Sequence, residues 1–128
     1  TPEDEETMRQ HTLLGARMLE ELDAYRDEDF VRVAYQICRW HHERYDGSGY
    51  PDQLVGEQIP IAAQVVGLAD AYETLTTGSG SQPPVPCAAA VQMLCTGEAG
   101  AFNPVLLDCL REIENEIDDA MRRRPETL

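Results

Sequence analysis

The segment from His41 to Pro51 constrains the fold of this chain more than any other. It places His41 and His42 at the end of a predicted helix and follows them with a glycine-rich loop. Adjacent helical residues project about 100° apart, so two neighbouring imidazoles converge on one point only where the helix ends. A histidine pair before such a loop suggests a metal beside a pocket. The alternative is a polar helix end, where imidazolium interacts well with the helix dipole.

Apolar residues at three- and four-residue steps predict an all-α fold, a bundle of about five helices. The expected helices span 3–24, 28–43, 61–76, 86–96 and 103–123, with a long ordered loop over 45–59 and a flexible break over 78–84. The final helix has Asn103 as its expected cap and Pro104 at its first position. With 128 residues, the chain is expected to form one domain. Because it begins with Thr1, we interpret it as a piece of a longer protein or as a processed or trimmed chain.

The periodicity also predicts which helix faces are buried. The expected core face of the first helix carries Met8, His11, Gly15, Met18 and Leu22, and that of the second carries Phe30, Val33, Ala34, Ile37 and His41. Gly15 lowers helix stability and usually marks the close approach of another element.

The charge of the chain excludes some partners. It has 24 acidic residues against 10 arginines and no lysine, a net charge of −14, so DNA and RNA would be repelled. No apolar run is long enough to span a bilayer. The four cysteines lack CxxC spacing, which favours free thiols and a cytoplasmic location.

Four residues are candidates for metal chemistry. His41 and His42 are joined by His11, the remaining histidine of the chain, although a lone inward histidine is more often a core residue. Asp70 lies in an apolar helix without a cation three or four residues away. If it is buried, a metal or a histidine would supply the missing positive charge; the alternative is that it faces water.

These positions resemble the HD-GYP family, a branch of the HD superfamily of metal-dependent phosphohydrolases. The resemblance covers most of the chain, and it is most specific in the run His41-His42-Glu43-x-x-Asp46-Gly47-x-Gly49-Tyr50-Pro51. Before this run, Met8-x-x-His11-x-x-x-Gly15 also matches, and after it the match includes Leu68-Ala69-Asp70-x-Tyr72.

The resemblance implies a helical bundle that holds two or three metals, usually iron or manganese, and hydrolyses cyclic-di-GMP. It implies that His11, His41 and His42 bind one metal and that Asp70 binds its neighbour. It also implies that the loop of Asp46, Gly47, Gly49, Tyr50 and Pro51 lies beside the substrate pocket and contacts GGDEF-type partner proteins. The alternative for this loop is a structural turn, in which Asp46 closes an Asx-turn.

The chain departs from the family pattern at two places. The His-Asp doublet that bridges the metals should precede the segment from Glu3 to His11, and it is absent from this sequence. The family's arginine-rich run after Asp70 is replaced by Ser79-Gly80-Ser81-Gln82. What remains is a three-histidine site for one divalent transition metal, such as iron or manganese, and weak binding of a cyclic dinucleotide.

Three functions follow from these observations. We favour a degenerate, catalytically impaired domain that acts as a regulatory or signalling module. The alternative is an active cyclic-di-GMP phosphodiesterase whose missing metal ligands lie on upstream chain. The third is a structural helical module that forms a homodimer through exposed apolar surface.

Overall fold

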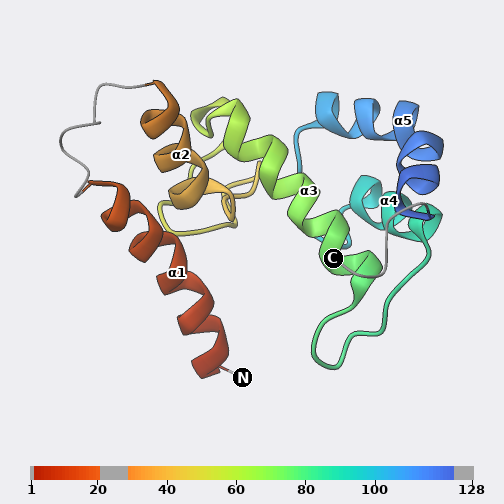
Figure 1. Ribbon diagram of the computed structural model, residues 1–128, viewed down its shortest axis with the longest axis horizontal. Coiled ribbons are helices and arrows are strands. Elements are labelled where there is room, and N and C mark those ends of the chain that lie inside the picture. The colour runs from red at the N-terminus through yellow and green to blue at the C-terminus, as the bar shows by residue number, and fades with distance from the viewer. Residues whose placement is uncertain (1, 21–28, 123–128) are drawn as a thin grey trace. The chain divides into compact units, whose positions relative to one another are not determined.

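The protein is described by a computed structural model, which covers residues 2–20 and 29–122 (Figure 1). Five α-helices follow one another along the chain: α1 (Pro2–Glu20), α2 (Asp29–Trp40), α3 (Ile61–Thr77), α4 (Cys87–Thr96) and α5 (Pro104–Arg122). A short 3-10 helix, η2 (Gly56–Gln58), precedes α3. The described residues contain two isolated β-bridges and no strand, so the predicted all-α fold is confirmed.

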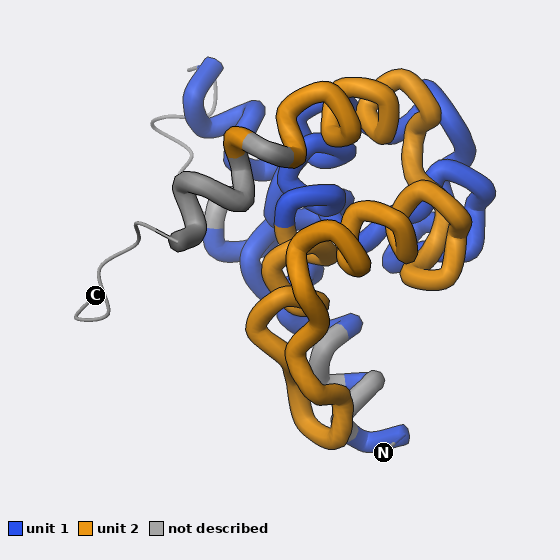
Figure 2. The backbone as a smooth tube through the Cα atoms, turned by 90° about the vertical axis from the view of Figure 1, so that its right-hand side faces the viewer, with its two compact units in different colours: residues 1–69 blue, residues 70–128 orange. Residues whose placement is uncertain are grey.

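The chain forms two compact units, residues 1–69 and 70–128, with the division inside α3 (Figure 2). The expectation of one domain stays a prediction. The buried apolar residues of the first unit are Ala16, Val31, Ile59, Ala63 and Leu68. Those of the second unit are Tyr72, Ala90, Val91, Leu94, Phe102 and Leu110. Among the described residues, no helix is long and apolar enough to cross a membrane.

The helix ends agree with the sequence except at α2. Asn103 caps α5 as predicted, because its Oδ1 accepts the backbone N–H of Val105 at 3.0 Å. The predicted ends of the first and last helices, 21–24 and 123, lie outside the described residues. The predicted end of α2 at residue 43 is wrong, since the helix ends at Trp40 and the histidines that follow lie in a turn.

The buried face of α1 differs from the predicted one. His11 is exposed and Met18 is 64% exposed, whereas Thr12 and Ala16 are buried. The cause is the close approach of α2: a Cβ added at Gly15 would lie 3.3 Å from the Cβ of Cys38. Small residues at 12, 15 and 16 share one helix face and permit this approach, as the glycine predicted. The side chain of Met8 and all of Leu22 lie outside the described part.

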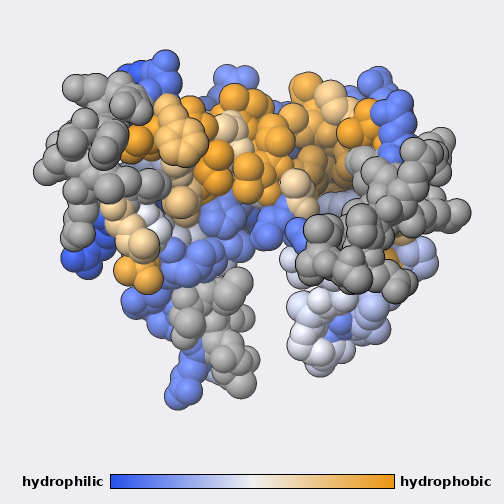
Figure 3. All heavy atoms as spheres, viewed as in Figure 1, coloured by the Kyte–Doolittle hydropathy of each residue, from blue (hydrophilic) through white to orange (hydrophobic). Residues whose placement is uncertain are grey.

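The predicted face of α2 is also wrong at its first turn. Phe30 is 79% exposed and Val33 is 41% exposed, while Val31 is buried between them. Ala34 and Ile37 are half-buried, so the prediction holds only toward the end of the helix. Hydrophobic residues therefore reach the surface of the first unit, and Figure 3 shows apolar side chains exposed over several elements.

The loop between α2 and η2 is ordered by a buried carboxylate. Glu43 is 5% exposed, and its two carboxylate oxygens accept the backbone N–H groups of Asp52 at 2.6 Å and Leu54 at 2.8 Å. Ionised acceptors make hydrogen bonds roughly twice as strong as neutral ones. Glu43 therefore holds the part of the loop around Asp52 and Leu54 against the residues that directly follow α2.

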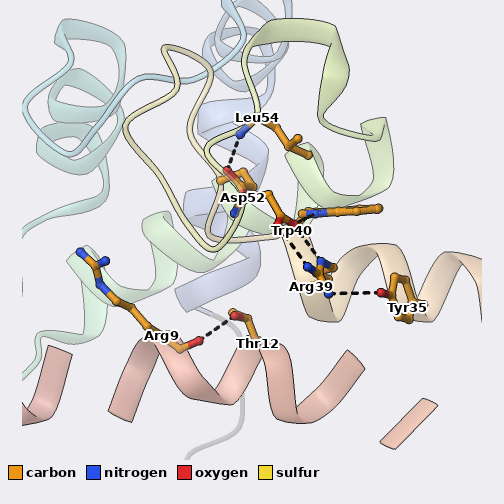
Figure 4. Close-up of polar contacts among 8 residues, drawn as sticks. Arg9, Thr12, Tyr35, Arg39, Trp40, Asp52 and Leu54 are labelled. Atoms are coloured by element: carbon orange, nitrogen blue, oxygen red, sulfur yellow. Dashed lines mark hydrogen bonds and ion pairs between the residues drawn. The ribbon is translucent and has the colours of Figure 1, made fainter. Parts of the chain in front are cut away.

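A second contact ties the loop to the last residues of α2 (Figure 4). The carboxylate of Asp52 accepts two hydrogen bonds from the guanidinium of Arg39, at 2.8 and 3.1 Å, and one from the indole N–H of Trp40 at 2.6 Å. The hydrogen bond from Arg39 and that from Trp40 hold the pKa of Asp52 below its usual range.

Gly49 and Gly67 allow other backbone segments to approach the two histidines. A Cβ at Gly49 would collide with the backbone of residues 42–44, and one at Gly67 on α3 would lie 2.5 Å from the carbonyl oxygen of His41. At these two positions, glycine is required by space rather than by backbone conformation.

We predict that Glu43→Gln lowers the free energy of unfolding by about 1–3 kcal/mol. The amide keeps the size of the side chain, but it replaces one accepting oxygen by an NH₂ donor. One of the two backbone N–H groups therefore loses its buried acceptor. Glu57→Gln is the matched control, because Glu57 is exposed in the neighbouring 3-10 helix and its change should cost less than about 0.5 kcal/mol. Equal denaturant midpoints for the two variants would contradict the role of Glu43.

Asp52→Asn should destabilise the protein at pH 7 and do so less as the pH falls. The folded-state pKa of Asp52 is depressed, so the ionised carboxylate stabilises the fold above the unfolded-state pKa near 3.8 and loses this effect as pH drops through the folded value. Urea unfolding of both proteins between pH 7 and pH 3 measures this difference. A difference that stays constant over this range would contradict the ion pair.

Candidate metal centre

The imidazoles of all three histidines lie together in the first unit. His11 comes from α1, and His41 and His42 from the turn after α2; one ligand atom from each lies within 4.8 Å of the others. The ring centroids of His41 and His42 are 4.3 Å apart. The ring centroid of His11 lies 5.6 Å from that of His41 and 5.0 Å from that of His42. The two adjacent residues converge because α2 has ended before them.

The backbone fixes which nitrogen of His41 is available. Nδ1 of His41 lies 2.6 Å from the carbonyl oxygen of Ile37, one turn earlier. Because a carbonyl only accepts hydrogen bonds, Nδ1 carries a proton, and in the neutral ring Nε2 is the nitrogen with the free lone pair. Metal-binding histidines are commonly oriented by such a hydrogen bond on the other ring nitrogen.

His42 is held neutral by its surroundings. Burial, followed by the nearby His41, His11 and Arg44, lowers the pKa of His42 to about 3. Its ring also stacks on that of Tyr50, with centroids 5.1 Å apart and an angle of 10° between the planes. A neutral, oriented imidazole is the form that binds a metal.

This donor set suits a divalent transition metal. Imidazole nitrogens bind zinc, iron, copper and nickel, at about 2.0–2.1 Å for zinc. Two such ligands at right angles lie about 3 Å apart, so the three nitrogens, which lie within 4.8 Å of one another, would draw closer to share one ion. His11 is exposed and the other two rings are half-buried, which leaves a solvent-accessible side for further ligands.

The loop residues predicted from the sequence are placed as follows. Tyr50 lies against His42, and its backbone N–H donates to the carbonyl oxygen of His42 at 3.3 Å. Gly49 packs on the same backbone. Asp46 is exposed and closes the predicted Asx-turn, since its Oδ1 accepts the N–H of Ser48 at 3.0 Å. Gly47 adopts φ +85°, and Pro51 follows Tyr50 through a cis peptide bond.

Asp70, the fourth predicted ligand, is exposed on α3 and belongs to the second unit. Because its carboxylate reaches water, burial does not demand a neighbouring cation. Its part in holding a metal stays a prediction.

Three residues beside the histidines were not singled out from the sequence. Glu43 and Asp52 hold the loop, and Arg9 of α1 places its guanidinium carbon 5.3 Å from the centre of the Tyr50 ring. Glu43 follows the histidine pair directly, so its closeness to the site could be predicted from the sequence. Its burial could not be predicted, because a glutamate in an acidic chain is usually solvated.

Comparison with known proteins identifies the family. The HD domain family matches residues 1–105. A probable cyclic di-GMP phosphodiesterase of Vibrio cholerae is 36% identical over 125 residues, covering 95% of this chain and 28% of the relative. A cyclic di-GMP phosphodiesterase of Thermotoga maritima is 32% identical over 123 residues, covering 96% of this chain and 32% of the relative.

A third relative acts on a different cyclic dinucleotide. The 3'3'-cGAMP-specific phosphodiesterase 2 of Vibrio cholerae is 33% identical over 82 residues, covering 64% of this chain and 16% of the relative. The chain thus spans about a third or less of the length of these relatives. On the match to residues 1–105, this chain belongs to the HD domain family, and it is related to cyclic di-GMP phosphodiesterases.

Proposed function

We propose that His11, His41 and His42 hold one divalent transition metal and that this centre binds the phosphates of a cyclic dinucleotide. The observation that carries the proposal is the convergence of all three histidines of the chain, from two segments, within 4.8 Å. A bound divalent ion would supply Lewis-acid polarisation of a phosphoryl oxygen.

The protein's own groups prepare this site. Ile37 fixes the tautomer of His41, and burial keeps His42 neutral at physiological pH. Glu43 and Asp52 hold the loop that brings Tyr50 against His42. These contacts orient the imidazoles before any ligand arrives, which reduces the entropy lost on binding.

We further propose that these 128 residues by themselves act as a regulatory binding module and do not hydrolyse the nucleotide. No His-Asp doublet occurs in this sequence, and the segment from Ser79 to Gln82 has no cation for the phosphates. A site built around two metals would need further ligands.

The second candidate is an active phosphodiesterase, and the names of the relatives favour it. It requires metal ligands from chain beyond this sequence. Cyclic di-GMP is the first ligand to test, and 3'3'-cGAMP the second, because relatives of both specificities match.

The remaining parts of the proposal concern location and protein partners. We place the domain in the cytoplasm, where its free cysteines would stay reduced. A GGDEF-type partner at the loop from Asp46 to Pro51 and a homodimer are further proposals. The exposed Phe30 and Met18 support self-association, since apolar surface favours burial.

Metal analysis tests the site directly. After anaerobic loading with Fe²⁺ or Mn²⁺ and desalting, we expect about one equivalent of metal per chain. His42→Ala should lower metal affinity by more than about tenfold, because one of three nitrogen ligands is lost. Elemental analysis measures both. Metal content below about a tenth of an equivalent in the unmodified protein would overturn the proposal.

Asp70→Asn is the control for this experiment. If one metal is held by the three histidines, this substitution leaves the metal content unchanged. A drop from about two equivalents to about one would instead show that Asp70 holds a second ion, as the family resemblance implies.

Nucleotide turnover separates the two candidate functions. Chromatography of cyclic di-GMP incubated with the metal-loaded protein should show no linear product above the protein-free control. Product formed at a rate that His42→Ala abolishes would establish the phosphodiesterase and contradict the regulatory module.

A further inference from the structure

Arg9 is a cation beside Tyr50, the residue that stacks on His42, and the proposed function does not yet use it. It lies on α1, and its guanidinium carbon is 5.3 Å from the centre of the Tyr50 ring. Figure 4 shows its side chain leaving α1 on the side of the loop. The carbonyl oxygen of Arg9 accepts the hydroxyl of the buried Thr12 at 2.8 Å, which fixes the backbone at its base.

The contact with Tyr50 leaves the guanidinium available to an anion. An arginine over an aromatic ring is attracted by the ring quadrupole, so its five N–H donors are not consumed by that contact. The planar fork of donors matches the oxygens of a phosphate. Ring contact also restricts the long side chain, which lowers the entropy lost when a ligand binds.

Arg9 is connected to the candidate metal centre through Tyr50. The guanidinium of Arg9 contacts the Tyr50 ring, which stacks on His42 with centroids 5.1 Å apart, and the His42 ring centroid lies 5.0 Å from that of His11. Tyr50 thus links the guanidinium of Arg9 to the imidazole of His42. Cyclic dinucleotides carry two phosphodiester groups, so a ligand with one of them at the imidazoles has a second anionic group to offer to a nearby cation.

Two arginines at the end of α2 and in the loop that follows it, Arg39 and Arg44, are engaged in the structure of the first unit. Arg39 is paired with the carboxylate of Asp52, and Arg44 donates to the carbonyl oxygen of Glu43 at 3.2 Å. In a chain of net charge −14, an anionic ligand needs a local cation to offset the surrounding field.

We propose that Arg9 contacts a phosphodiester of the bound nucleotide and gives the site its preference for phosphate-bearing ligands. This inference rests on the proposed function. It assigns to α1 the phosphate contact that the segment from Ser79 to Gln82 cannot make through side-chain cations.

Equilibrium dialysis with cyclic di-GMP and the metal-loaded protein tests the inference. Arg9→Gln should raise the Kd by about tenfold or more, because it removes a charge-assisted bidentate contact. Arg9→Lys should recover only part of the affinity, since it keeps the charge and loses the fork. Arg17→Gln is the matched control, an exposed arginine two turns further along α1, and it should bind as the unmodified protein does.

Two further measurements separate phosphate recognition from a structural role. Metal content should be the same in all four proteins. Guanosine, which has no phosphate, should bind equally to the unmodified protein and to Arg9→Gln. The inference alone is overturned if Arg9→Gln and Arg17→Gln have equal effects, or if guanosine binding falls in parallel. If the unmodified protein holds no metal or binds no cyclic di-GMP, the proposed function is overturned and the inference with it.

Discussion

The carboxylate of Glu43 accepts two backbone N–H groups from the opposite side of the loop, in a place that is almost closed to water. This contact makes the end of α2 a defined turn rather than a frayed helix. Once the helix ends at Trp40, the side chains of His41 and His42 no longer point about 100° apart. Their rings meet at 4.3 Å, and the loop brings Tyr50 against one of them. The candidate metal centre is therefore a consequence of how one helix is terminated.

The charge of the surface differs from that of the site. The acidic surface repels polyanions, whereas the site itself contains the neutral imidazole of His42 and an arginine held over an aromatic ring. Under the proposed function, a small ligand with two phosphates would contact a metal and a guanidinium together, while a long nucleic acid would meet the surrounding negative field. The relatives named as phosphodiesterases of cyclic di-GMP and of 3'3'-cGAMP are the reason to test small cyclic dinucleotides first.

Much of the architecture could be predicted from sequence periodicity and a few local signals. The helical fold, the Asn103 cap, the Asx-turn at Asp46 and the close approach at Gly15 follow from rules that act over four residues or fewer. The convergence of His41 and His42 was expected because the helix must end near them, although it ends at Trp40, before the pair, and not at residue 43. The buried faces of α1 and α2 could not be predicted in this way. Close packing at Gly15 favours burial of the small residues Thr12 and Ala16 rather than of Met18. A pattern based on hydrophobicity alone does not predict this preference for small side chains. The roles of Glu43 and Arg9 depend on residues far along the chain, which no local pattern connects.

The central claim is that three imidazoles share one metal ion. X-ray absorption spectroscopy of the iron- or manganese-loaded protein tests it most directly, because the fine structure reports the number and kind of ligand atoms. We predict nitrogen and oxygen ligands only, with the multiple-scattering signature of about three imidazoles. A sulfur ligand from one of the cysteines, or the signature of a single imidazole, would contradict it.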